Sequence, residues 1–332
     1  MATTVDDAFA EFMRNTVDLD PQTVKDARKS RDNLLENIDE FDNTVFFNLV
    51  SRYNVHFGSF SRKTKCRELD DIDLMIGISA EGATYYTNNS WNNIAIKASK
   101  RNSTQIECSN SDGTLNSTKV LNRFKRKLEN VREYSRSDIK RCGEAVVLNL
   151  RSKAWSFDII PCFHTTEESD GRAYYLIPNG NGAWKKTEPT IEQNVIARVN
   201  NRHSQQVVNT IRLIKYWNKR RQMPTMSSYV LETMIVNYFD EISETYDWID
   251  MRFSEGLNYI ARNIWNPVYD SKNIEGNINT LSYQEKANIQ ERAKSDYNNT
   301  CSAITADTTE KNQLKAINIW RNILGEDFPT YG

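Results

Sequence analysis

The sequence lacks a long apolar run, an excess of either charge and any ordered pattern of cysteines. No apolar stretch approaches the roughly 20 residues that a membrane-spanning helix needs, so we expect no membrane partner. The 43 Lys and Arg residues against 44 Asp and Glu give a formal net charge of −1, whereas proteins that coat nucleic acids usually carry a basic excess. We therefore expect no strong nucleic-acid binding, and a polyanionic substrate would have to be held locally.

Cysteine and histidine are too scattered to indicate a metal centre. The cysteines form no CxxC pair and have no histidine at ligand spacing, which argues against structural zinc and a disulfide framework. They are Cys66, Cys108, Cys142, Cys162 and Cys301. The first twenty residues have neither the basic start nor the apolar stretch of a signal peptide. These absences predict a soluble, cytoplasmic protein.

Glycine and proline are also sparse, with 12 and 7 residues in 332, and neither a linker nor an internal repeat divides the chain. Alternation of polar and apolar residues in 71–79 predicts a strand, and the apolar runs 145–150 and 156–163 predict two more. The basic stretch 122–141 between them is compatible with a helix. From about Ile191 almost to the end, the pattern is helical.

Helices are also expected in the first fifty residues, because proline just inside a helix start, with aspartate before it, is a helix-start signal at Asp20-Pro21. We therefore predict an α+β fold with a mixed sheet and flanking helices in 1–190, followed by an all-helical lobe in 191–332. The expected helices are 6–15, one opened at Pro21, one around 208–217, one from near Ser227, then 282–298 and 310–324.

The main chemical signal is a set of three aspartates. Residues two apart on a strand point to the same face, so Asp71 and Asp73 project together. Asp158 lies amid apolar residues of another predicted strand, where it is expected to face a site or a partner. Adjacent carboxylates repel each other unless a cation lies between them, and magnesium prefers such oxygen ligands. If the two strands are neighbours, the three carboxylates suit a two-metal site for phosphoryl transfer.

Gly58 and Ser59 precede the aspartate pair and are candidates for phosphate binding. Glycine lets the backbone approach a phosphate closely, and the serine hydroxyl and nearby amides can bind its oxygens. Each feature alone has an ordinary explanation: Gly-Ser is a common turn, Asp-x-Asp is often a solvated strand edge, and a lone aspartate can be a satisfied buried acceptor. Their order, with strand character at both aspartate sites, favours the catalytic interpretation.

The segment FGSFSRKTKCRELDDIDLMIGI resembles the signature of the DNA-polymerase-β-like nucleotidyltransferases, which is a Gly-Ser pair, then Asp-x-Asp, then a distant third Asp. Within that superfamily the chain is most similar to the bacterial cyclic-oligonucleotide synthases (CD-NTases), relatives of cyclic GMP–AMP synthase and oligoadenylate synthase. GSFSRKT resembles their GSFxRxT loop, and FDIIPCF resembles their third-carboxylate strand. The resemblance runs from about residue 45 to the end.

This resemblance implies a polymerase-β-like catalytic lobe, an oligoadenylate-synthase-like helical lobe and an active site in the cleft. It implies two Mg²⁺ ions as cofactors, held by Asp71, Asp73 and Asp158, with Mn²⁺ as a substitute. IRLIKYWNKRR and SSYVLE are similar to the family's paired helices that grip the triphosphate. Lys215 is therefore expected to contact phosphates, Ser228 to bind them at a helix start and Tyr229 to border the base. The ordinary alternatives are a solvated lysine and an N-cap serine.

The function implied by the resemblance is condensation of NTPs, with pyrophosphate release, into a cyclic di- or trinucleotide second messenger for antiphage defence. ATP and GTP are the first expected substrates and pyrimidine NTPs the next. A cyclic-nucleotide-responsive effector is the expected downstream partner. Three alternatives remain: a template-independent nucleotidyltransferase acting on an RNA end or small molecule, a non-catalytic nucleotide-binding sensor, and a purely interaction-based role. The intact aspartate set argues against a sensor, because clustered charge is costly to keep.

Overall fold

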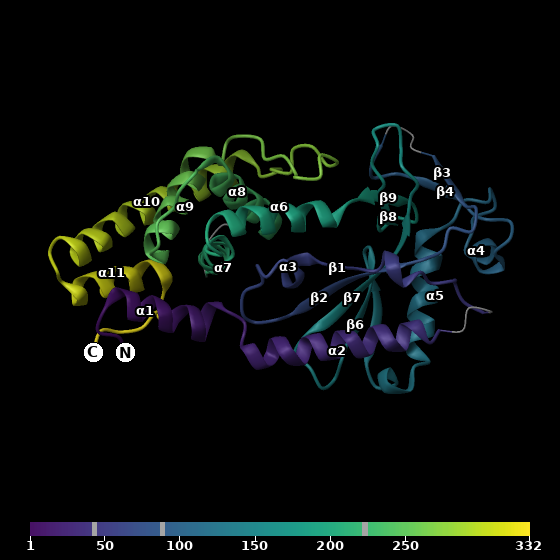
Figure 1. Ribbon diagram of the computed structural model, residues 1–332, viewed down its shortest axis with the longest axis horizontal. Coiled ribbons are helices and arrows are strands. Elements are labelled where there is room, and N and C mark those ends of the chain that lie inside the picture. The colour runs from purple at the N-terminus through teal and green to yellow at the C-terminus, as the bar shows by residue number, and fades with distance from the viewer. Residues whose placement is uncertain (42–44, 87–89, 221–224) are drawn as a thin grey trace. The chain divides into compact units, whose positions relative to one another are not determined.

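The computed structural model describes residues 1–41, 45–86, 90–220 and 225–332, which group into two compact units (Figure 1). The sheet unit comprises Gln22–Arg62 and Leu69–Gln193, and the helical unit comprises Met1–Pro21, Lys63–Glu68 and Asn194–Gly332. The short segment Lys63–Glu68, which leads from the Gly-Ser pair to the aspartate pair, therefore groups with the helical unit.

Within the described residues, the sheet unit is built on a seven-stranded mixed sheet. Its strands are β1 (Val55–Phe57), β2 (Asp71–Gly77), β5 (Asp138–Cys142), β6 (Ala145–Asn149), β7 (Ser156–His164), β8 (Tyr175–Pro178) and β9 (Trp184–Thr187). The order is β1-β2-β7-β6-β5, with β8 paired to β7 and β9 paired to β8. Strands β2 and β7 are parallel, while β1, β6 and β8 run antiparallel to their neighbours. A separate hairpin is formed by β3 (Thr84–Tyr86) and β4 (Ala95–Lys97).

Sequence alternation gives this sheet two different faces. One face carries the buried side chains Ile72, Leu74, Ile76, Phe157 and Ile159. Helix α5 (Ser117–Glu129) contacts the strands β5, β6 and β7, and its buried residues Val120, Leu121, Phe124 and Leu128 recur at helical spacing. The opposite face carries a smaller buried cluster that includes Val55, Met75, Ala145, Ile160 and Cys162. The other helices of this unit are α2 (Pro21–Asp39), α3 (Gly58–Ser61) and α4 (Ser103–Glu107).

The three predicted strands are present as β2, β6 and β7, but the helix predicted over 122–141 is wrong in its second half. Helix α5 ends at Glu129, and a 3-10 turn at Arg132–Tyr134 then leads into β5. In β5 the buried Ile139 lies among exposed residues, which is typical of a charged edge strand. A single apolar residue in a polar run shows no period, so the sequence could not distinguish this strand from a helix.

The helical unit packs its helices around one apolar core. They are α1 (Val5–Phe12), continued by a π-helical turn at Met13–Val17, then α7 (Val207–Asn218), α8 (Ser228–Glu241), α9 (Ile249–Asn263), α10 (Tyr283–Thr308) and α11 (Gln313–Leu324). Helix α6 (Pro189–Arg202) begins in the last residues of the sheet unit. Among the described residues, every helix is too short or too polar to cross a membrane.

The N-terminal helix α1 belongs to the helical unit, which differs from the predicted division at residues 190 and 191. Phe9 contacts Trp320 and Phe328 edge to face, with ring centroids 4.9 and 5.0 Å apart, and Ala2 pairs with Tyr331. Periodicity identifies the apolar stripe of a helix, but it does not say which distant element covers that stripe. At the other boundary, the division falls between Gln193 and Asn194.

Asp250, in the first turn of α9, gives the helical unit a predictable response to pH. It is 6% exposed, and burial, followed by the charges of Asp6 and Asp307, raises its pKa from 3.8 to about 6. Because the folded pKa is the higher one, the contribution of Asp250 to stability is most favourable below pH 4 and is lost as pH rises through 6. Asp250→Asn cannot ionise, so we expect it to increase the free energy of unfolding by roughly 2–3 kcal/mol at pH 7.

Urea unfolding of the wild type and Asp250→Asn at several pH values measures this effect. Near pH 4 the increase in the free energy of unfolding should be a fraction of the increase at pH 7, because the wild-type carboxyl is then protonated in the folded state. A gain that does not change between pH 4 and pH 7 would show that Asp250 is not titrating in this range.

Candidate active site

The parallel pairing of β2 and β7 brings the three predicted aspartates onto one face of the sheet. Asp73 lies opposite Asp158, and Asp71 lies opposite Ser156. Opposed residues on neighbouring strands share a face, and Asp71 shares it because it is two residues from Asp73. The condition stated from the sequence, that the two strands be neighbours, is therefore met. The carboxylates lie at the end of the sheet where β2 and β7 begin, beyond the buried cluster around Met75 and Ile160.

The three carboxylates are half-buried, and each makes contacts within the molecule. In the part of the chain that the structure describes, no group of three or more His, Cys, Asp or Glu side chains is close enough to hold a metal ion. The backbone register of β2 and β7 places the three carboxylates on one face of the sheet. Like charges held in this way favour a bound cation.

Gly58 brings the backbone directly against Asp73. Phe57, the last residue of β1, pairs with Asp73, and the chain then turns into α3. Gly58 has a φ of 71°, and a Cβ built on it would lie 1.7 Å from Asp73 Oδ2. This position therefore requires glycine both for its conformation and for the close approach. Ser59 follows in the same short turn of helix, and it also makes contacts within the molecule.

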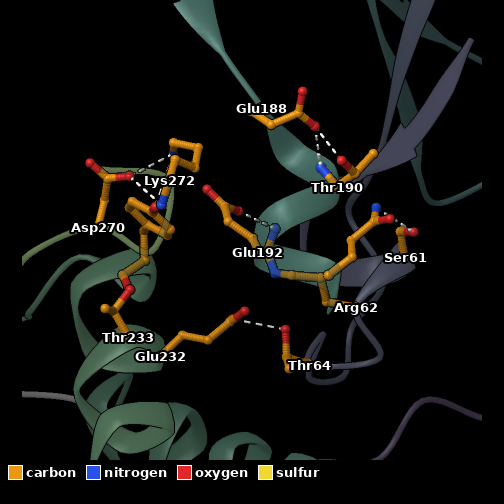
Figure 2. A network of polar contacts seen from close by, with 12 residues as sticks. Ser61, Arg62, Thr64, Glu188, Thr190, Glu192, Glu232, Thr233, Asp270 and Lys272 are labelled. Atoms are coloured by element: carbon orange, nitrogen blue, oxygen red, sulfur yellow. Dashed lines mark hydrogen bonds and ion pairs between the residues drawn. The ribbon is translucent and has the colours of Figure 1, made fainter. Parts of the chain in front are cut away.

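The start of α6 braces the turn that follows Ser59. The Gln193 side-chain amide donates to the carbonyl of His56 and, at 3.3 Å, to Ser61 Oγ. Arg62 Nη1 donates to Glu192 Oε2 at 3.3 Å, and both side chains are largely buried (Figure 2). No sequence motif marks Glu192 or Gln193, because polar residues in the first turns of a helix are ordinary. Only the fold brings them to the Gly-Ser turn.

Lys215 lies in a buried ion pair within the helical unit. It is 4% exposed, and its Nζ donates to Glu232 Oε2 at 2.5 Å and to the carbonyl of Thr64 at 3.2 Å. Thr64 Oγ1 donates to the same carboxylate oxygen at 2.8 Å (Figure 2). The solvated lysine considered from the sequence is therefore wrong. The ion pair joins α7, α8 and the segment Lys63–Glu68.

The other two predicted residues of this unit lie at the start of α8. The helix begins at Ser228, as expected from the sequence, and Ser228 is exposed. The N-cap is Ser227, which makes no side-chain capping hydrogen bond, so the N-cap alternative for Ser228 is wrong. Tyr229 is half-buried, and its hydroxyl accepts a hydrogen bond from Lys272 Nζ at 2.9 Å.

The pKa shifts near these residues argue against a catalytic thiol. Cys162 lies on the same sheet face as Asp158, and burial raises the pKa of its thiol. Burial likewise raises the pKa of Cys66. Both thiols therefore stay protonated at neutral pH and are poor nucleophiles. Burial, and then the charge of Arg31, lowers the pKa of His56, which favours a neutral imidazole.

Loss of the buried ammonium should destabilise the protein strongly. Lys215→Ala removes the cation that faces the buried carboxylate of Glu232, and breaking such a pair costs roughly 3–5 kcal/mol. Urea unfolding without nucleotide measures this loss separately from any effect on substrate binding. The control is Lys315→Ala, which removes the exposed Lys315–Glu310 pair and should cost less than about 1 kcal/mol. Equal losses in both variants would contradict a structural role for the buried pair.

The chain is similar in sequence to two proteins named as cyclic nucleotide synthases. No protein-family model matches the chain. It is 36% identical over 338 residues to a probable cyclic nucleotide synthase of Bacillus cereus (strain VD146), with 100% of this chain and 99% of that protein covered. It is 21% identical over 204 residues to a cyclic AMP-AMP-AMP synthase of Acinetobacter sp. (strain ATCC 27244 / 9458), covering 55% of this chain and 53% of that one.

Solved structures resemble the whole chain. Two structures of CdnC from E. coli MS115-1, one in complex with HORMA-deltaN and one with ATP, each match with a TM-score of 0.69 at 15% identity. Each match covers 98% of both chains. At this identity the likeness concerns the fold, and it confirms the predicted fold class.

Proposed function

Because the chain belongs to the family of bacterial cyclic-oligonucleotide synthases (CD-NTases), we propose that it condenses nucleoside triphosphates into a cyclic di- or trinucleotide. The observation that carries the proposal is the register of β2 and β7, in which Asp73 lies opposite Asp158 and Asp71 shares their face. The full-length relative is named a probable cyclic nucleotide synthase, which supports the reaction class.

In the proposed reaction, a 3′- or 2′-hydroxyl of one nucleotide attacks the α-phosphorus of another. A new P–O bond forms, the bond from the α-phosphorus to the bridging oxygen breaks, and pyrophosphate leaves with the electron pair. Asp158, which lies on the neighbouring strand opposite Asp73, is the residue that we assign to accept the proton of the attacking hydroxyl. A second bond of the same kind, formed within the linear dinucleotide, closes a dinucleotide ring and releases a second pyrophosphate. For a trinucleotide, one more nucleotide is first added, and a third bond closes the ring and releases a third pyrophosphate.

The chemical type of the three ligands suits divalent cations. Three carboxylates on one face offer the hard oxygen ligands that Mg²⁺ prefers, and the bare backbone of Gly58 leaves room for the Asp73 carboxylate. Asp71 and Asp73 would hold two Mg²⁺ ions, with Asp158 as a further ligand. When bound, the ions supply positive charge that offsets the triphosphate and eases loss of the hydroxyl proton. Mn²⁺ is an expected substitute, since carboxylate oxygen ligands suit it too.

Five residues are proposed to bind the nucleotides. Gly58 and Ser59 offer backbone N–H groups and a hydroxyl to phosphate oxygens. Ser228 is exposed at the first turn of α8, where free N–H groups favour an anion, and Tyr229 offers a ring to a base. Because Lys215 is paired with Glu232, its ammonium would have to bind a phosphate together with that carboxylate or in place of it. The CdnC structure with ATP supports a nucleotide substrate of this kind. ATP and GTP are the first proposed substrates, and pyrimidine NTPs are the next.

The same family membership supports a proposal for the biological role. We propose that the cyclic product is a second messenger in antiphage defence, made in the cytoplasm and read by an effector that binds it. An effector is identified by its binding to the purified product, so the chemistry of the product must be established first.

The test is incubation of the purified protein with the four NTPs and MgCl₂ or MnCl₂, without any acceptor. We expect pyrophosphate release and a product that resists alkaline phosphatase, because a cyclic molecule has no terminal phosphate. Mass spectrometry and nuclease mapping then give its bases and linkages. A transferase acting on RNA ends or small molecules would give no product without an acceptor, and a non-catalytic sensor would release no pyrophosphate. Either outcome would overturn the proposal.

A further inference from the structure

Tyr229 is held in place by a buried lysine that no sequence motif marks. Lys272 Nζ donates to the Tyr229 hydroxyl at 2.9 Å and lies 4.8 Å from the centroid of its ring. Lys272 is 4% exposed, although lysine is almost never fully buried unless it is paired. The ammonium therefore contacts the hydroxyl end of the ring, and this contact restricts where the ring can lie.

Two carboxylates keep Lys272 at this position. Glu275 Oε1 lies 2.9 Å from its Nζ, and Asp270 Oδ1 lies 4.0 Å away. The fully buried Asp270 carboxylate also accepts the backbone N–H group of Lys272 at 2.8 Å (Figure 2). It accepts that of Glu275 at 2.6 Å as well. One aspartate thus shapes the turn and offsets the charge of the lysine within it.

The turn that carries Lys272 is anchored within the helical unit between α9 and α10. Tyr269 pairs with Asn277, and Ile278 N donates to the carbonyl of Val268 at 2.7 Å. The buried Asn279 side chain donates to the carbonyl of Ile264 at 2.8 Å. These bonds give the lysine a defined place, so its contact with Tyr229 is built into the fold.

We propose that Lys272 and Tyr229 form one base-recognition element, in which Lys272 is a positioning residue that holds the Tyr229 ring in place for stacking on a purine. This inference rests on the proposed function, since it needs a nucleotide base beside Tyr229. Base–aromatic stacking stabilises a bound nucleotide, and a ring already held in place loses less entropy on binding. A purine presents the larger π-surface, so a fixed ring favours purine over pyrimidine nucleotides.

Two variants test this inference. Tyr229→Phe keeps the ring and leaves Lys272, Asp270 and Glu275 unchanged, but it removes the hydroxyl that accepts from Lys272. Lys272→Met removes the ammonium and keeps a chain of similar length. Each should raise KM for the purine NTP substrate about 5- to 10-fold, the scale of one ordinary hydrogen bond, with kcat within about twofold. The double variant should be no worse than the more affected single variant, because both changes break the same contact.

Binding of α,β-methylene ATP, GTP and CTP gives a readout that does not depend on turnover. The wild type should bind the purine analogues more tightly than the CTP analogue. In both variants the ratio of the Kd for the CTP analogue to the Kd for the purine analogues should be smaller. The control is Lys315→Met, at an exposed ion pair with Glu310, which should leave Kd and KM unchanged. Thermal unfolding of each variant shows whether it is folded. If Lys272→Met is not folded, Tyr229→Phe carries the test.

The outcomes separate this inference from the proposed function. Unchanged Kd and KM in Tyr229→Phe would overturn the inference, as would fold-changes that multiply in the double variant or a fall in kcat alone. Equal wild-type binding of purine and pyrimidine analogues would overturn the purine preference. A wild type that makes no product from NTPs refutes the proposed function instead, and the Kd comparison still tests the recognition element.

Discussion

Asp73→Asn is expected to abolish product formation while leaving the protein folded. Asp73 lies opposite Asp158 and against the bare backbone of Gly58, so its charge contributes to any cation held at this end of the sheet. An amide of the same shape keeps the strand register but offers a weaker, neutral ligand. We expect the rate of pyrophosphate release to fall on the order of 10³-fold or more, equivalent to about 4 kcal/mol of barrier.

Thermal unfolding with and without divalent ions distinguishes loss of the site from loss of the fold. Mg²⁺ or Mn²⁺ should raise the Tm of the wild type, because a ligand of the folded state stabilises it, and should raise that of Asp73→Asn less. Without added cation the variant should be at least as stable as the wild type, since it removes repulsion between carboxylates.

Asp138→Asn is the matched control for this substitution. Asp138 lies on edge strand β5 and pairs through Asn149 and Ser156 with Asp71, so it belongs to the same row of the sheet. It is exposed and lies away from the carboxylate set, so activity should be retained. A fully active Asp73→Asn would remove Asp73 from the catalytic machinery.

The carboxylate set could be predicted from the sequence because its geometry is almost entirely local. The spacing of Asp71 and Asp73 fixes their common face once the segment is a strand, and apolar residues on both sides of Asp158 identify a second strand. The one long-range fact is that β2 and β7 are neighbours in a register that opposes Asp73 to Asp158. From the sequence alone the pairing is only a condition, and the register comes from the structure.

The supporting contacts could not be predicted, because each depends on a pairing between distant segments. Glu192 and Lys272 carry no motif, and only the fold brings them to Arg62 and Tyr229. For the same reason the sequence allowed a solvated Lys215, whereas the fold buries it and pairs it with Glu232 on the next helix.

Gly58→Ala should inactivate the protein through the position of Asp73. The added Cβ would lie 1.7 Å from Asp73 Oδ2, well inside contact distance, so the carboxylate or the turn must move. Alanine at a φ of 71° also costs roughly 1–2 kcal/mol of backbone strain. Because a displacement of about 1 Å at a reacting centre can cost on the order of 10²-fold in rate, we expect at least that loss of activity.

Gly143→Ala separates the clash from the strain. Gly143 has a φ of 53°, and a Cβ there would meet nothing within 4 Å, so this variant carries similar backbone strain without a collision. Both variants should lose some thermal stability, but only Gly58→Ala should lose pyrophosphate release and the Mg²⁺-dependent rise in Tm. Equal activity of Gly58→Ala and Gly143→Ala would show that Asp73 tolerates displacement. The close approach of Gly58 to Asp73 would then have no catalytic consequence.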